Sequence, residues 1–162
     1  MVAGLPIITL SIMALCIWSF FSPETALVFI YSRDAALKGE AWRLLSSHLV
    51  HFSNSHLVCN LLAFGAIGAI MEARSHWRFL ALSLLSATSI GTALIIFEPT
   101  MSYYGGLSGV ICSLIFYITL CETQESGSTK TMAKVFLAVL SVKIAFETLT
   151  GNSLFISKEE HG

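Results

Sequence analysis

Long apolar runs separated by short polar stretches dominate this sequence. The run Phe79–Phe97 contains no charged residue and, as a helix, is long enough to cross about 30 Å of hydrocarbon. Two other runs are also free of charge, and two shorter ones contain polar residues. One such run is compatible with a soluble core helix, whereas five in succession predict an all-α protein that crosses the membrane repeatedly. The five runs are Leu5–Phe21, Leu57–Met71, Phe79–Phe97, Gly105–Cys121 and Val135–Leu149.

The connections between these runs are short, apart from the segment between the first and second. Residues Ser22 to Ser55 are too polar to span a membrane and too apolar for a solvated linker. We therefore expect an interfacial structure here, with Trp42 and Tyr31 as anchors at the level of the lipid headgroups. Glu98-Pro99 is expected to end the third helix. No internal repeat is visible, and a single domain over residues 1–162 is expected.

Composition supports the membrane interpretation. The chain is 55% hydrophobic and 12% charged, against about 25% charged residues in ordinary soluble domains. A net charge of −1 with scattered basic residues gives no sign of a nucleic-acid partner. The first run lacks a preceding basic region and a cleavage site, so we interpret it as a retained helix. All cysteines lie in apolar runs without a Cys-x-x-Cys pair, which favours buried free thiols over disulfides or a metal site: Cys16, Cys59, Cys112 and Cys121.

Ser108 is the first candidate for chemistry. It stands at the start of an apolar run, flanked by Gly105, Gly106 and Gly109. Glycines before a helix leave room around a hydroxyl, and the first N–H groups of a helix are free to bind an oxyanion. Small residues at this spacing also favour close packing of membrane helices. The segment alone therefore leaves both a catalytic and a packing interpretation open.

Histidines and an asparagine form a second group. His56 and Asn60 are four residues apart, so on a helix they share one face. Polar residues within a membrane segment usually serve a cavity or a site, and these two could donate hydrogen bonds to an oxyanion. A zinc site using His48 and His51 is a weaker alternative, because it lacks an adjacent glutamate and an obvious third ligand.

Charged residues at helix ends complete the set. Glu72 and Arg74 at the far end of the second run are interpreted as structural, either as an ion pair or as helix-end charges. Lys143 and Glu147, four apart on the fifth run, favour a mutual ion pair. The alternative is that Lys143 acts as a general base for Ser108, since a desolvated lysine can titrate low enough.

Taken in order, these residues resemble the rhomboid family of intramembrane serine proteases. The residues and motifs that carry the resemblance are Trp42-Arg43, His51, His56, Asn60, Glu72-x-Arg74 and Gly106-Leu107-Ser108-Gly109. The resemblance implies a rhomboid-like helical bundle in which Ser108 is the nucleophile. It further implies an oxyanion site formed by His56, Asn60 and the Ser108 N–H, with structural roles for Trp42, Arg43, Glu72 and Arg74. No cofactor or metal is implied, and the partners would be transmembrane protein substrates and the lipid bilayer.

A subgroup and a location also follow from resemblance. The stretch Lys38–Leu45 with His48 and His51, together with Lys143, Glu147 and Thr150-Gly151, looks like the compact bacterial rhombosortases. This implies a multi-pass protein of the bacterial inner membrane and substrates with C-terminal Gly-Gly sorting signals. Charge counts on the two sides are equal and do not orient the chain. The family places its serine near the outer face.

The catalytic base is the feature that this sequence supplies least clearly. Rhomboids use a histidine on a sixth helix, and the one candidate after the fifth run is His161, one residue before the sequence stops. We expect a C-terminal truncation with a missing sixth helix. Cys112 stands where many rhomboids have a tyrosine. The alternative function is a non-catalytic rhomboid-like protein that binds transmembrane helices. A small transporter subunit is a third possibility, but it would require repeated halves.

Overall fold

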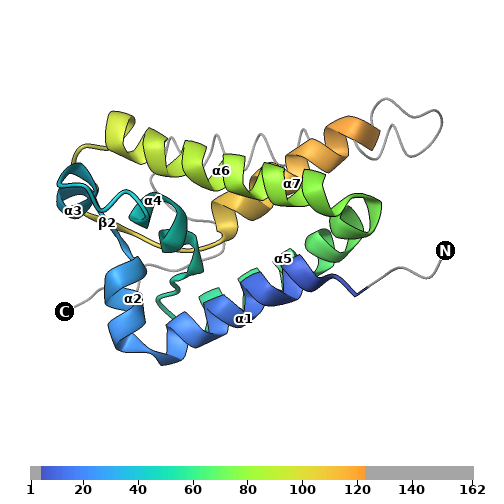
Figure 1. Ribbon diagram of the computed structural model, residues 1–162, viewed down its shortest axis with the longest axis horizontal. Coiled ribbons are helices and arrows are strands. Elements are labelled where there is room, and N and C mark those ends of the chain that lie inside the picture. Colours follow the sequence, from blue (N-terminus) through green and yellow to red (C-terminus); the bar gives the residue numbers. More distant parts are fainter. Residues whose placement is uncertain (1–4, 123–162) are drawn as a thin grey trace. The chain divides into compact units, whose positions relative to one another are not determined.

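The computed structural model describes residues 5–122, and within this range the regular secondary structure is helical apart from one pair of two-residue strands. Contacts divide the whole chain into two units, residues 1–114 and 115–162. The four longer helices of the described range are α1 (Ile7–Phe21), α5 (Asn54–Arg74), α6 (His76–Phe97) and α7 (Ser108–Glu122). Figure 1 shows these helices along the chain. The first unit contains α1, α5, α6 and α7 up to residue 114, and it contains the candidate site residues His56, Asn60 and Ser108.

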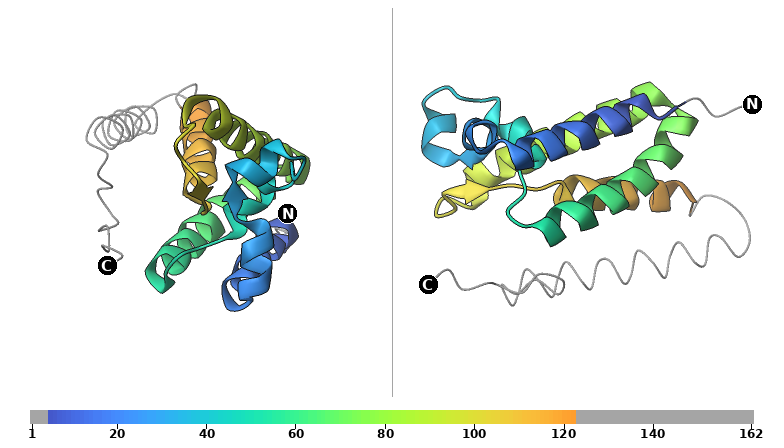
Figure 2. Two further views of the ribbon diagram at one scale, coloured as in Figure 1. Left: turned by 90° about the vertical axis from the view of Figure 1, so that its left-hand side faces the viewer. Right: turned by 90° about the horizontal axis from the view of Figure 1, so that it is seen from below.

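The long helices begin and end where side chains dictate. Ser53 caps α5, because its hydroxyl accepts the N–H of His56 at 3.2 Å. Ser75 is the single residue between α5 and α6 and caps α6 by accepting the N–H of Arg78. In Figure 2 the two helices accordingly meet in a sharp turn. The end of α6 at Phe97, just before Glu98-Pro99, confirms the expected stop.

Two of the described helices are long and apolar enough to cross a membrane, namely α5 and α6. A third span results if α1 and α2 (Pro23–Phe29) are counted together, although the chain bends by 114° between them. The apolar part of α7, Ser108–Cys121, is shorter. The fold is therefore that of an all-α membrane protein. The expected fifth run, Val135–Leu149, lies outside the described residues.

Glu72 joins α5 to the start of α1. Its side chain is 1% exposed, and its two carboxylate oxygens accept the N–H groups of Ile8 and Thr9 at 2.8 Å each. The Thr9 hydroxyl donates a third bond of 2.8 Å. These N–H groups belong to the first turn of α1 and have no acceptor within the helix. The N-terminus of a helix also favours a nearby negative charge. Glu72 is thus a buried helix cap rather than a surface charge, which specifies the structural role expected for it.

The segment between α1 and α5 folds into short elements that pack onto the helices. They are α2, β1 (Tyr31–Ser32), α3 (Arg33–Leu37), α4 (Arg43–Ser46) and the 3-10 turn η1 (Ser47–Leu49). The strand β1 pairs antiparallel with β2 (Tyr103–Tyr104), and in this register Tyr31 lies opposite Tyr104. The loop that precedes α7 is therefore tied to this segment.

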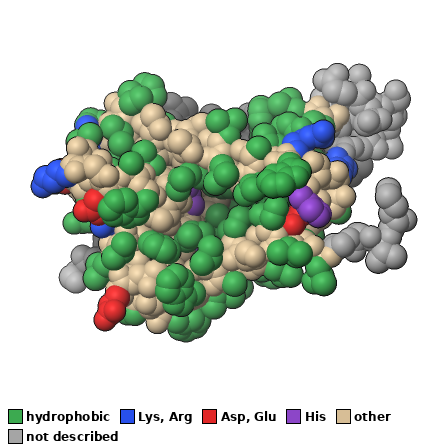
Figure 3. Space-filling view, viewed as in Figure 1, with side chains coloured by type: hydrophobic (Ala, Val, Ile, Leu, Met, Phe, Trp, Pro, Cys, Tyr) green, Lys and Arg blue, Asp and Glu red, His purple; other side chains and the backbone are tan. Residues whose placement is uncertain are grey.

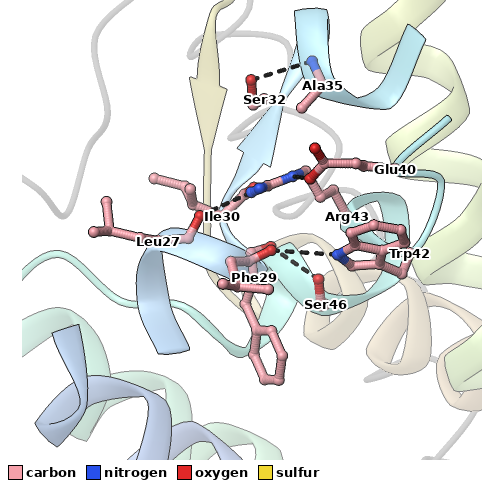
Figure 4. Close-up of polar contacts among 10 residues, drawn as sticks. Leu27, Phe29, Ile30, Ser32, Ala35, Glu40, Trp42, Arg43 and Ser46 are labelled. Carbon is pink, nitrogen blue, oxygen red and sulfur yellow. Dashed lines mark hydrogen bonds and ion pairs between the residues drawn. The ribbon is translucent and has the colours of Figure 1, made fainter. Parts of the chain in front are cut away.

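Arg43 and Trp42 hold the segment together through backbone carbonyls. Arg43 donates to the carbonyl oxygens of Leu27 (2.9 Å) and Ile30 (2.8 Å) and forms an ion pair with Glu40 at 2.7 Å (Figure 4). The Trp42 indole N–H donates to Val28 O at 3.4 Å while half of the residue stays exposed.

Tyr31 corrects one expectation. Its side chain is completely buried, so it is a core residue and not an anchor at the headgroup level. The mixture of polar and apolar residues around it could not show this, because the strand that holds Tyr31 pairs with β2, more than 70 positions away.

A glycine in α6 allows α4 to approach closely. A Cβ atom on Gly91 would lie 2.8 Å from the Leu44 carbonyl oxygen and 2.9 Å from its Cα, closer than real Cβ atoms come to backbone. The backbone of α4 therefore lies directly against α6. This contact places the residues that follow α4, including His48, between α6 and the loop before α7.

The surface of the described part is largely apolar. On the face shown in Figure 3, hydrophobic side chains cover the middle and charged ones gather toward the two ends. Exposed large apolar residues on the spanning helices include Leu62, Trp77 and Phe97, as expected for helices that face lipid. Of the cysteines, Cys16 is buried, whereas Cys59 and Cys121 are exposed and Cys112 is half-buried. No disulfide joins these cysteines in the part of the chain that the structure describes, but the expectation of burial was wrong for Cys59 and Cys121.

Candidate active site

Ser108 is the first residue of α7 and is exposed, whereas Gly105, Gly106 and Leu107 before it are buried. The first bond of the helix runs from Ile111 N–H to Leu107 O at 2.9 Å. The N–H groups of the first turn consequently have no partner within the helix. The placement of a serine hydroxyl beside free N–H donors, expected from the glycine-flanked motif, is therefore present.

His56 and Asn60 lie against Gly106. A Cβ atom on this glycine would be 2.7 Å from His56 Cε1, 2.8 Å from His56 Nε2 and 3.7 Å from Asn60 Nδ2. Gly106 also has a φ of +123°, a backbone conformation that residues other than glycine rarely adopt. The structure thus brings the His-x-x-x-Asn face of α5 and the glycine two residues before Ser108 into direct contact.

Asn60 carries an unsatisfied donor. The residue is 6% exposed, and its Nδ2 has no hydrogen-bond partner among the residues that the structure describes. A buried amide left unpaired costs about 1–3 kcal/mol. Such a cost in a native fold calls for a reason, and a donor held ready for an oxyanion next to Gly106 is one that fits its position.

His51 and His56 form an adjacent pair of rings, with centroids 5.0 Å apart. His51 Nδ1 contacts Leu49 O at 3.3 Å, and its Nε2 is buried without a partner among the described residues. Burial, and secondarily the neighbouring His56, lower the pKa of His51 to about 4. His51 is therefore neutral at pH 7. The alternative of a zinc site gains no support from the described residues, in which no group of three or more His, Cys, Asp or Glu is placed to bind a metal.

Residues of η1 hold the Gly106 backbone from both sides. The Gly106 N–H donates to Ser47 O at 3.1 Å, and His48 Nδ1 lies 3.1 Å from Gly106 O. The Tyr104 hydroxyl donates to the same carbonyl at 3.5 Å. The sequence did not single out Ser47, because it acts through its backbone carbonyl. It did not single out Tyr104 either, because the partner of its hydroxyl is the backbone carbonyl of Gly106. His48 was a visible signal.

The other predicted residues lie in different surroundings. Gly109 packs on α6, where a Cβ atom would meet Ile90 Cδ1 at 2.9 Å. Trp42, Arg43 and Glu72 lie away from Ser108 in the contacts described above, and Arg74 is the last residue of α5. The expected base His161, and also Lys143, Glu147 and Thr150-Gly151, fall outside the described residues.

A glycine-flanked serine at a helix N-terminus, with a histidine and a buried amide beside it in an apolar helical bundle, is typical of a membrane-embedded serine hydrolase. The comparison with protein families then specifies which kind. Residues 38–159 match the model of the Rhomboid domain, and the chain therefore belongs to the rhomboid family.

A named relative agrees with this assignment. The chain is 29% identical over 157 residues to the "Rhomboid protease GlpG homolog" of Cronobacter sakazakii (strain ATCC BAA-894). The match covers 93% of this chain and 55% of that protein, so the chain spans about half the length of the relative. The chain is an integral membrane protein of this family.

Proposed function

We propose that this protein is a serine endopeptidase that cleaves membrane-anchored proteins in or near a transmembrane segment, with Ser108 as the nucleophile. The observation that carries the proposal is the contact of Gly106 with His56 and with Asn60 Nδ2, which has no hydrogen-bond partner among the described residues. Gly106 lies two residues before α7, whose first N–H groups have no partner within the helix. The rhomboid family and the name of the relative support the same class of activity.

The proposed reaction follows from this arrangement. Ser108 Oγ attacks the carbonyl carbon of the scissile bond, and its proton passes to a base, for which His161 is our candidate. The negative charge on the former carbonyl oxygen is held by the Ser108 N–H, Asn60 Nδ2 and the His56 ring. The C–N bond then breaks, the amine leaves with the proton, and water hydrolyses the acyl-enzyme. Structural support would come from Trp42, Arg43, Glu72 and Arg74.

The test is labelling of the full chain in detergent with a fluorophosphonate probe, which phosphonylates an activated serine with loss of fluoride. We expect wild type to be labelled and Ser108→Ala not to be. Ser113→Ala is the matched control, because Ser113 lies on the same helix and its hydroxyl is engaged with Gly109 O at 3.0 Å. An unlabelled wild type, or labelling that survives Ser108→Ala, would exclude Ser108 as the nucleophile. Association with a transmembrane partner without any labelling would instead favour the non-catalytic binding function.

A finer proposal concerns the substrate. The resemblance to rhombosortases suggests proteins that end in a Gly-Gly motif, an apolar helix and a basic tail, processed at the bacterial inner membrane. Two reporter substrates that differ only in Gly-Gly or Leu-Leu before the apolar helix separate the possibilities. Preferential cleavage of the Gly-Gly reporter is expected, and equal cleavage of both would contradict this specificity while leaving the peptidase activity intact.

A further inference from the structure

His48 is a buried polar side chain that the proposed reaction does not use. The residue is 2% exposed, and each ring nitrogen faces one backbone carbonyl, Nδ1 at 3.1 Å from Gly106 O and Nε2 at 3.1 Å from Ala87 O. The cavity beside it is almost entirely apolar and has a volume of about 340 Å³; its lining includes Leu15, Phe64, Leu84 and Val110. Through its contacts with the two carbonyls, the ring connects α6, which contains Ala87, to the loop before Ser108, which contains Gly106.

These two contacts compete for one proton. Both carbonyl oxygens only accept, and a neutral imidazole has one N–H. Burial lowers the pKa of His48, so the neutral ring is the form present at pH 7. A titratable side chain that packs on the ring within the described part of the chain is Tyr104, with ring centroids 5.6 Å apart. Burial raises the pKa of Tyr104 to about 12, so it brings no negative charge to stabilise an imidazolium.

The surroundings of the two carbonyls decide which nitrogen carries the proton. Ala87 O lies in the interior of α6, where the N–H of Gly91 four residues on serves it in the helical ladder. Gly106 O lies in a loop, and its other donor, the Tyr104 hydroxyl, is 3.5 Å away. The Gly106 carbonyl therefore needs the imidazole proton more than Ala87 does.

We propose that His48 is a positioning residue for Ser108: its Nδ1–H donates to Gly106 O and fixes the orientation of the Gly106–Leu107 peptide. Ser47 O holds the N–H of Gly106 on the other side, so η1 restrains both polar groups of this glycine. In a trans peptide the N–H points opposite to the C=O, so the bond also sets the direction of the Leu107 N–H and the start of α7. This inference rests on the proposed role of Ser108.

Two substitutions distinguish this role from simple packing. The amide nitrogen of an asparagine lies near the position of histidine Nδ1, and that of a glutamine near Nε2. His48→Asn therefore retains the donor to Gly106 O, whereas His48→Gln retains the one to Ala87 O. Glutamine fills the histidine volume better, so a purely structural role predicts that His48→Gln is the milder change.

The first measurement is the rate at which the full chain in detergent reacts with the fluorophosphonate probe, alongside thermal stability. We expect His48→Asn to stay within a fewfold of wild type and His48→Gln to react roughly tenfold to a hundredfold more slowly, as for other displacements of a reacting group. The opposite order of rates, or rates that simply follow stability, would overturn the proposal.

The second measurement does not depend on activity. In wild-type protein with ¹⁵N-labelled histidine, NMR identifies the protonated ring nitrogen, and loss of signals in His48→Asn assigns them to His48. A proton on Nδ1 at pH 7 is expected, and a proton on Nε2 would refute the inference. If wild type is not labelled by the probe, the proposed peptidase function fails, while the tautomer still tests the bond to Gly106.

Discussion

The ring of His56 occupies the space that a side chain on Gly106 would need, with Cε1 2.7 Å from the position of its Cβ. A residue larger than glycine would fit here only with a shift of the His56 ring, of α5 or of the loop before Ser108. The contact thus couples the backbone of the serine loop to a side chain of the expected oxyanion site.

Gly106→Ala is therefore expected to destabilise the fold and to abolish probe labelling. The unfavourable φ of +123° costs about 1–3 kcal/mol, and the collision with His56 adds to it. Gly39→Ala is the matched control, because Gly39 has a similar φ of +112° but nothing within 4 Å of its Cβ position. Unfolding in detergent measures both. If the two variants lose equal stability and both remain labelled, the contact with His56 contributes neither to stability nor to the reactivity of Ser108.

Asn60→Ala is expected to slow probe labelling by roughly 10²-fold without lowering thermal stability. The reason is that Nδ2 is buried and unpaired among the described residues, so the fold gains little stability from it. The phosphoryl oxygen of the probe, in contrast, would accept a hydrogen bond from Nδ2. Cys59→Ala is the control, since Cys59 is the preceding residue and is exposed; it should change neither quantity. A parallel loss of stability and labelling in Asn60→Ala would indicate a structural role instead.

The sequence predicts the parts of this site that depend on local periodicity and capping. The shared face of His56 and Asn60 follows from their spacing on α5, and the position of Ser108 at the start of α7 follows from the glycines before it. The stop of α6 before Pro99 is likewise local.

Other parts depend on contacts between distant segments, which a single sequence does not encode as a pattern. Backbone atoms make the close contact between Leu44 and Gly91 and the hydrogen bond from the Gly106 N–H to Ser47 O. The buried Tyr31 lies on a strand that pairs with β2, far along the chain. Glu72 illustrates the intermediate case, because its structural role could be expected from a charge at a helix end, but its partner, the start of α1, could not.

Glu72→Gln is expected to lower the free energy of unfolding by about 2 kcal/mol. A glutamine retains one acceptor oxygen but turns its NH₂ group toward one of the two N–H groups, that of Ile8 or that of Thr9, and it removes the charge at the start of α1. Glu24→Gln is the control, since Glu24 is an exposed residue in the first turn of α2, where a change within about 0.5 kcal/mol is expected. Equal effects in the two variants would show that the buried cap contributes nothing beyond a surface charge.

Stability should fall as the pH is lowered from about 6.5 to about 4, because of His51. The pKa of this histidine is lowered from 6.5 to about 4 in the fold, chiefly by burial and then by His56. Between these values the unfolded chain binds more protons than the folded one, so the free energy of unfolding rises with pH through this window and is constant above it. The lowered pKa of His48 acts in the same direction.

The contribution of His51 is up to about 3 kcal/mol by this linkage, and thermal unfolding in detergent from pH 4 to 8 measures it. His51→Asn retains an amide near the Nδ1 position facing Leu49 O and should flatten the pH dependence, since the titrating ring is gone. His76→Gln is the control, because His76 is exposed at the start of α6, and it should leave the slope in place. A wild-type slope that persists in His51→Asn would mean that other groups cause it, and that the buried His51 ring is protonated in the fold as easily as in the unfolded chain.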